Sequence, residues 1–203
     1  MGVAVEPPWL IAIAASAGGI QALGTIVSGL PRALPAAVAI VQHGPPPRPS
    51  SLKQILSRRA HLPVTVAIEG DAIRPGTIYL PGREGLHLTV SGDRHFTYAD
   101  GHQIRFQLSP ADPLLESAAL VFTTHLIAVV LTGTGASGTY GVQCVNTHGG
   151  LVIAQDPAGA AEWVIPHVTM YPGSLDLVLA LHSIAPALVA LVHGASVKAL
   201  ATP

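Results

Sequence analysis

Short apolar runs alternate along this chain with segments whose apolar positions repeat at helical spacing. The runs predict strands at 9–15, 36–42, 64–68, 76–80, 126–132, 151–155 and 175–180. The segments between them predict helices at 20–29, 50–60, 113–124, 138–148 and 182–194. The first, second and fifth runs are apolar on both faces, which is typical of parallel strands covered by helices on both sides.

The middle of the chain follows a different pattern. Residues 76–108 alternate more between apolar and polar positions, with turn signals at Pro81-Gly82, Ser91-Gly92-Asp93 and Asp100-Gly101. These signals predict short antiparallel strands and hairpins. We therefore predict one doubly wound α/β domain over residues 9–195: a mostly parallel sheet with helices on both faces and an antiparallel hairpin addition. Residues 1–8 and 196–203 are expected to be tails.

The first strand ends in the most informative segment of the chain, Trp9–Gly19, which reads WLIAIAASAGG. Gly18 and Gly19 allow the backbone to turn sharply from the strand into a helix. Such a corner exposes Ser16 at the carboxyl edge of the sheet, where the amides of the helix start point towards it. A serine at this place is more often a helix cap or a turn residue, so Ser16 alone is a weak candidate for a nucleophile.

Two further strands end in residues that can take part in catalysis. His43 follows the strand at 36–42, and the glycine-rich segment GTGASG at 133–138 follows the strand at 126–132. If these strands are neighbours, their ends meet with Ser16 at one edge, where α/β sheets bind ligands. A serine with a histidine in reach is the minimum for nucleophilic acyl transfer, and backbone amides can hold the oxyanion.

The glycine-rich segment also supports a dinucleotide-binding alternative. GTGASG matches GxGxxG, follows an apolar strand, opens a helix and precedes a strand that ends at Asp156. That is the spacing of a Rossmann fingerprint with its ribose-binding acid, as found in oxidoreductases. Against this alternative, the motif lies about two-thirds along the chain and leaves Ser16 and His43 unexplained.

Composition narrows the class of protein. With 203 residues, a net charge of −1 and only 10% charged residues, the chain gives no case for binding nucleic acid or an anionic membrane. The single cysteine, Cys144, excludes an internal disulfide and is expected to pack inside a helix.

No apolar run reaches the roughly 18–20 residues of a membrane span, so we expect a cytoplasmic protein without membrane insertion. The histidines show neither HxH nor HExxH spacing, and we expect no metal and no cofactor. The low charge is consistent with a homodimer.

Four segments, in their order and spacing, resemble the catalytic domain of the chemotaxis protein-glutamate methylesterases (CheB-type). They are IAIAASAGGIQAL, IVQHGPP, VVLTGTGASGTYG and LVIAQDPAGAAEWVIPHV. With a weaker match at DAIRPGTIYLP, the likeness covers about residues 9–192. Four segments in this order are far more specific than any one of them.

The resemblance implies a serine hydrolase that removes glutamyl methyl esters from chemoreceptors and deamidates certain receptor glutamines. By position, it makes Ser16 the nucleophile and His43 the general base. It also places the backbone amides of Ala17 and Thr134 where the family forms its oxyanion hole. The implied partner is a methylated receptor or another protein substrate.

The sequence departs from the family at the third member of the triad, because Ser137 stands where the family has aspartate. A hydroxyl can accept a hydrogen bond from the imidazole, but it offers no negative charge to the imidazolium. Loss of this carboxylate typically costs roughly 10⁴-fold in turnover. Asp112 and Asp156 match family positions that accompany the usual triad, so neither is a newly recruited substitute. A catalytically degenerate binding homologue is therefore an alternative to a weakened enzyme.

Two further departures concern substrate recognition and regulation. Arg105 is the only basic residue left in IRFQLSPAD, where the family is often arginine-rich, which weakens the case for an acidic receptor segment as substrate. The family usually joins this domain to an N-terminal receiver domain. We expect no receiver domain and no phosphorylation control within this chain.

Overall fold

The computed structural model describes residues 8–43, 49–100, 111–132, 138–160 and 173–200. The strands are β1 (Trp9–Ala15), β2 (Ala36–Gln42), β3 (Val64–Val66), β4 (Ile78–Leu80), β5 (Leu86–Val90), β6 (Phe96–Asp100), β7 (Leu126–Val130), β8 (Leu151–Gln155) and β9 (Leu177–Leu179). The α-helices are α1 (Gly19–Ser28), α2 (Pro49–Ser57), α3 (Ala111–Phe122), α4 (Thr139–Thr147), α6 (Leu181–Val192) and α7 (Val197–Leu200). Short 3₁₀ helices are η1 (Thr123–His125) and η2 (Pro157–Gly159).

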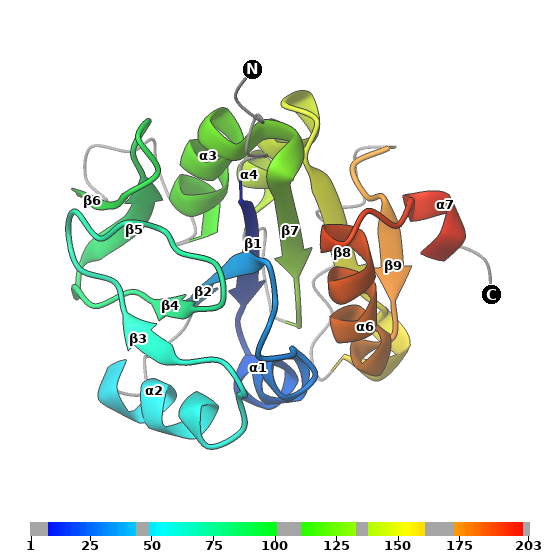
Figure 1. The fold of residues 1–203 in the computed structure, drawn as a ribbon, viewed down its shortest axis with the longest axis horizontal. Helices are drawn as coiled ribbons and strands as arrows, with labels where there is room; N and C mark the ends of the chain where they lie inside the picture. The colour runs from blue at the N-terminus through cyan, green and yellow to red at the C-terminus, as the bar shows by residue number, and fades with distance from the viewer. Residues whose placement is uncertain (1–7, 44–48, 101–110, 133–137, 161–172, 201–203) are drawn as a thin grey trace.

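A parallel sheet forms the centre of the molecule, with strand order β3-β4-β2-β1-β7-β8-β9 (Figure 1). The chain builds outwards from β1 through β2 on one side and later through β7 on the other. Strands β5 and β6 form a separate antiparallel pair. The predicted fold class, a doubly wound α/β sheet with an antiparallel hairpin addition, is confirmed.

Two apolar cores lie on opposite faces of this sheet. Strand β1 supplies both, because Ile11 and Ile13 point into one core while Leu10 and Ala12 point into the other. The first core is closed by α1, α2 and α6, and the second by α3, α4 and the β5–β6 hairpin. Alternating side chains that are all apolar explain why the central strands read as continuous hydrophobic runs.

The predicted elements are present, with different ends. The helices agree with the sequence-based ranges to within three residues at each end, and β1, β2 and β8 agree fully. Four predicted strands are shorter in the structure. The run at 64–68 keeps its first three residues as β3, 76–80 its last three as β4, 126–132 its first five as β7, and 175–180 three interior residues as β9. Both β3 and β9 lie at sheet edges and pair with one neighbour over three positions, so the other residues of these two runs lie outside the ladder.

The limits of the predicted domain remain a prediction. Residues 1–7 and 201–203 lie outside the described part of the chain. Near the C-terminus, Val197 and Leu200 of α7 pack against the first core. Among the described residues, no helix is both long enough and apolar enough to cross a bilayer.

Candidate active site

Ser16 lies at the first position after β1, in the sharp turn that leads into α1. Its backbone N–H donates to the Thr132 carbonyl at 3.0 Å, and its carbonyl accepts from Gly19 N–H at 2.8 Å. Gly18 has a φ of 75°, a left-handed conformation that favours glycine. A Cβ on Gly19 would lie 2.7 Å from the Ala15 Cβ. Both glycines are therefore needed to start α1 immediately behind the serine, and the helix begins one residue earlier than predicted.

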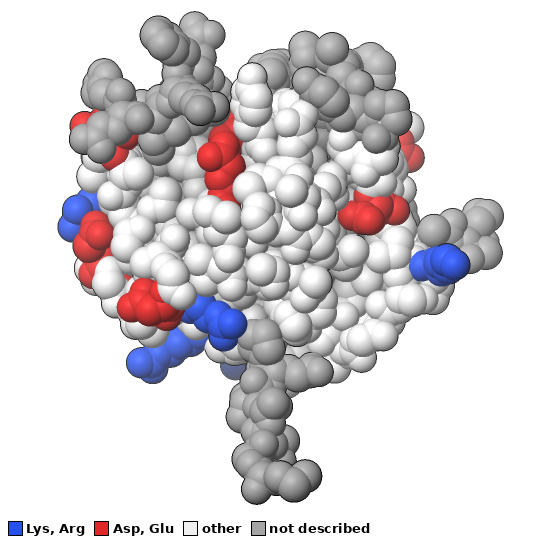
Figure 2. Space-filling model, turned by 90° about the horizontal axis from the view of Figure 1, so that it is seen from above, with Lys and Arg blue, Asp and Glu red and all other residues white. Residues whose placement is uncertain are grey.

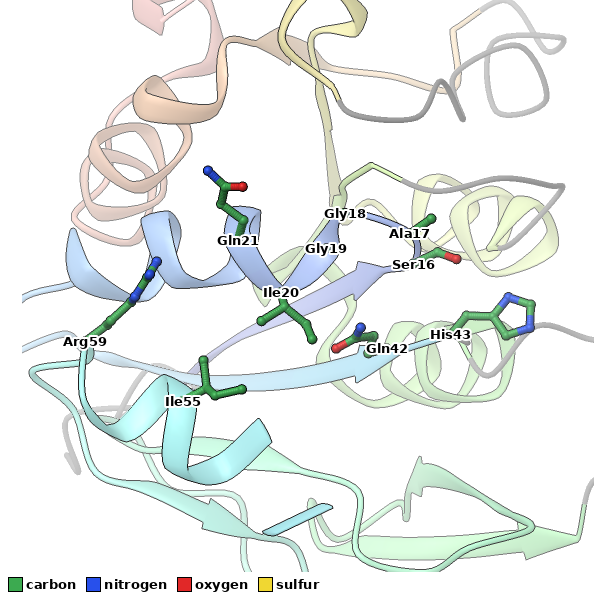
Figure 3. Close-up of a pocket in the computed structure, with 10 residues that line it drawn as sticks. All are labelled: Ser16, Ala17, Gly18, Gly19, Ile20, Gln21, Gln42, His43, Ile55 and Arg59. Atoms are coloured by element: carbon green, nitrogen blue, oxygen red, sulfur yellow. The ribbon is translucent and has the colours of Figure 1, made fainter. Parts of the chain in front are cut away.

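His43 lies at the end of the neighbouring strand. The register pairs Ala15 with Gln42, and His43 N–H continues the pairing by donating to the Ala15 carbonyl at 2.8 Å. The Ser16 hydroxyl and the exposed His43 ring consequently project from the same edge of the sheet (Figure 3). No hydrogen bond joins the two side chains here. Catalytic hydrogen bonds often tighten only when substrate is bound.

Two buried polar side chains, Thr132 and Gln155, form hydrogen bonds that stabilise the turn after Ser16. Thr132 Oγ1 donates to the Ala17 carbonyl at 3.1 Å, and Thr132 N–H donates to Gln155 Oε1 at 3.3 Å. Gln155 Nε2 in turn donates to the Gly159 carbonyl at 3.2 Å. Thr132 and Gln155 are each only 3% exposed. These bonds tie together the carboxyl ends of β1, β7 and β8, which fixes the backbone around the serine.

Thr132 and Gln155 were not among the predicted site residues, although the sequence carries a signal for both. Each is the polar residue that closes an otherwise apolar strand run, LIAVVLT and LVIAQ. A buried polar side chain at a strand end needs a partner, and here the partners are the turns of the site.

The remaining predicted site residues divide into described and undescribed ones. Ala17 follows Ser16 and is exposed in the turn. Thr134 and Ser137, the proposed oxyanion donor and the triad position, lie outside the described residues. Their roles therefore remain predictions.

The two carboxylates considered from the sequence as possible substitutes, Asp112 and Asp156, accept hydrogen bonds from backbone N–H groups at helix starts. Asp112, 2% exposed, accepts from Gly141 N–H at 2.8 Å and from Gly138 N–H at 3.3 Å, at the start of α4. Asp156 accepts from Ala158 N–H at 2.9 Å and caps η2. Within the described part of the chain, no residue hydrogen bonds to the His43 ring.

A cleft of about 640 Å³ opens between α1 and α2 and reaches Ser16 and His43 (Figure 3). Its lining residues are Ser16, Ala17, Gly18, Gly19, Ile20, Gln21, Gln42, His43, Ile55 and Arg59. The Gln42 Oε1 atom is buried and accepts no hydrogen bond from the described residues. A substrate chain that enters the cleft would meet Ser16 and His43 at its end.

The described residues contain neither an activated cysteine nor a cluster of metal-binding side chains. Cys144 lies in α4, with Sγ 3.9 Å from the Glu116 carbonyl oxygen. Burial, and secondly the charge of Glu116, raises the pKa of the Cys144 thiol, which disfavours the reactive thiolate. The described segments hold no group of three or more His, Cys, Asp or Glu residues able to bind a metal ion.

Comparison with known proteins decides the family. The model of the CheB methylesterase family matches residues 11–188. The chain belongs to the CheB methylesterase family. Its fold matches the crystal structure of the Thermotoga maritima CheB methylesterase catalytic domain with a TM-score of 0.82 and 31% identity, over 91% of this chain and 99% of that one. The family resemblance inferred from the four motifs is thereby confirmed.

Curated relatives carry names of the same kind. A protein-glutamate methylesterase/protein-glutamine glutaminase of group 2 operon from Rhodopseudomonas palustris is 38% identical over 92% of this chain and 49% of its own length. A protein-glutamate methylesterase/protein-glutamine glutaminase from Moorella thermoacetica is 38% identical over 92% of this chain and 45% of its own. The chain thus spans about half the length of these relatives. The family model spans residues 11–188 and so includes GTGASG, which argues against the dinucleotide-binding alternative.

Proposed function

We propose that this chain hydrolyses glutamyl methyl esters on a protein substrate, with chemoreceptors as the expected class, through a serine acyl-enzyme. The observation that carries the proposal is the placement of Ser16 and His43 on adjacent strand ends at the mouth of one cleft, in a member of the CheB family. The names of the relatives support the substrate, and also a second activity, the deamidation of glutamine.

In the proposed mechanism, His43 takes the hydroxyl proton as Ser16 Oγ attacks the ester carbonyl. The amides of Ala17 and Thr134 hold the oxyanion of the tetrahedral intermediate. Collapse of this intermediate breaks the bond to the methoxy group, which leaves as methanol with the proton from His43. Water activated by His43 then releases the glutamate carboxylate and restores Ser16. With a glutaminyl substrate, ammonia leaves in place of methanol.

Ser137 sets the expected rate. An imidazolium forms on His43 during each attack, and a neutral hydroxyl stabilises it less than a carboxylate would. We expect a slow enzyme whose residual rate comes from the oxyanion hole and substrate binding.

The test is methanol release from a glutamyl methyl ester peptide by the parent protein and by Ser16→Ala and His43→Ala. The proposal expects slow release by the parent and none above background by Ser16→Ala. Equal release by the parent and Ser16→Ala would refute the proposal.

A catalytically degenerate binding protein is the second candidate function. It is favoured by Ser137, which stands where the family has an aspartate. The two functions differ in methanol release. If the parent releases no more methanol than its Ser16→Ala control while Ser137→Asp releases it at a much higher rate, this second function is the correct one. The cytoplasmic location remains a prediction under either function.

A further inference from the structure

The cleft extends well beyond the reacting pair. From Ser16 and His43 it runs between α1 and α2, past Ile20 and Ile55, to Arg59 at its far end (Figure 3). Hydrolysis of a methyl ester needs only the first part of this space. The rest of the cleft, lined by Ile20, Ile55 and Arg59, is available to residues that flank the reacting glutamyl group.

Arg59 has a defined position at the far end. A Cβ placed on Gly24 of α1 would lie 2.5 Å from Arg59 Nη1 and 3.0 Å from its Cδ. The arginine side chain therefore lies across α1 in the space that the missing side chain of Gly24 leaves. Arg59 forms no ion pair with any residue that the structure describes. Among these described residues, its positive charge at the cleft has no counter-ion.

The segment of sequence that forms the cleft carries a net positive charge. Residues 7–68 contain no Asp or Glu, and they carry five of the ten Lys and Arg residues of the chain. Every residue that lines the cleft belongs to this segment. The whole chain has a net charge of −1, but the segment that lines the cleft is positively charged. This local positive charge favours an anionic ligand.

We propose that the cleft between α1 and α2 binds the peptide flanking the reacting ester, and that Arg59 pairs with an acidic side chain of that peptide. This inference rests on the proposed function and makes Arg59 a specificity-determining residue. The rise of α1 from Ile20 to Gly24 is about 6 Å, equal to about two residues of an extended chain. The preferred acid therefore lies a few residues from the ester, beyond the apolar stretch at Ile20 and Ile55.

The direct test measures binding, which does not require turnover. Two fluorescein-labelled peptides contain a glutamate methyl ester and differ only in flanking residues, which are glutamate in one and glutamine in the other. Their affinities for the Ser16→Ala variant are measured by fluorescence anisotropy. The acidic peptide is expected to bind more tightly. Adding Arg59→Gln should weaken its binding about three- to fivefold and leave the neutral peptide unchanged.

Arg58→Gln is the matched control, because it removes the same charge at the adjacent exposed position, which does not line the cleft. It should preserve the preference for the acidic peptide. Gly24→Ala tests geometry, since it displaces the Arg59 guanidinium while the charge remains. Alanine is favoured in helices, so circular dichroism should be unchanged while the acidic preference falls.

Several outcomes would overturn the inference: no binding of either peptide, equal binding of both by the Ser16→Ala protein, or equal losses with Arg58→Gln and Arg59→Gln. Its failure can be told apart from failure of the proposed function. If the parent hydrolyses both peptides with equal KM, the inference fails while ester hydrolysis stands. If Arg59-dependent binding is present but the parent releases no methanol, hydrolysis fails while the inference stands.

Discussion

Ser16 is held in place by its own backbone hydrogen bonds to Thr132 and Gly19 and by the residues around it. Gly18 and Gly19 make the turn, and Thr132 holds the carbonyl of the following residue. The two glycines were readable from the sequence, because a glycine pair after a strand indicates a sharp corner. The role of Thr132 was not, because its partner is 115 positions away along the chain.

Ser137→Asp should restore the negative charge that the proposed triad lacks at this position. If the aspartate reaches the His43 ring, it stabilises the imidazolium, and kcat should rise by up to roughly 10⁴-fold. Methanol release from the ester peptide measures this change.

The control for this substitution is the double variant Ser16→Ala/Ser137→Asp, which should stay inactive. An unchanged kcat in Ser137→Asp would show that position 137 does not serve the histidine.

Cys144 should be a slow thiol in the native protein. Because burial and Glu116 raise the pKa of its thiol, the thiolate fraction at neutral pH is smaller than in a free cysteine. Reaction with a disulfide reagent such as DTNB should be slow in the native state, faster as pH rises, and fast in denaturant. Native reactivity equal to that in denaturant would contradict this account.

At the scale of elements, α4 depends on a carboxylate from another helix. Its N-cap is Gly138, which has no side chain to cap it, and Asp112 of α3 accepts the N–H groups of Gly138 and Gly141 instead. A Cβ on Gly141 would lie 2.5 Å from the Leu115 Cβ, which shows how closely the two helices approach. Sequence alone assigned Asp112 no such task, because capping across helices leaves no local pattern.

Asp112→Ala should therefore destabilise the protein. It leaves two amide groups at the start of α4 without this acceptor, and we expect a loss of about 2–3 kcal/mol in the free energy of unfolding. Urea denaturation measures the loss as a lower midpoint at unchanged slope. Asp112→Asn keeps one oxygen acceptor and should lose less. If Asp112→Ala and the parent are equally stable, Asp112 does not cap α4.

At the scale of the whole molecule, the fold class was predictable because β1, β2 and β7 are apolar on both faces. That pattern requires helices on both sides of the sheet, as the two cores show. The order of the strands was not predictable from periodicity. That β1 lies between β2 and β7, bringing Ser16 and His43 to one edge, was only a condition of the prediction, and the structure meets it.

The surface is sparsely charged, and most of the face in Figure 2 carries neither acidic nor basic side chains. The exposed large apolar residues include Ile68, Leu120, Tyr140 and Val178. A homodimer remains a prediction from this composition. Light scattering checks it: a molar mass near twice 20.8 kDa is expected, and a mass near 20.8 kDa would contradict it.

The central claim is that Ser16 is an activated nucleophile. A fluorophosphonate probe reacts preferentially with a serine that a neighbouring base activates, and mass spectrometry locates the label. We predict modification at Ser16, strongly reduced by His43→Ala and absent in Ser16→Ala. A label at another residue, or no label on the folded parent protein, would contradict the account.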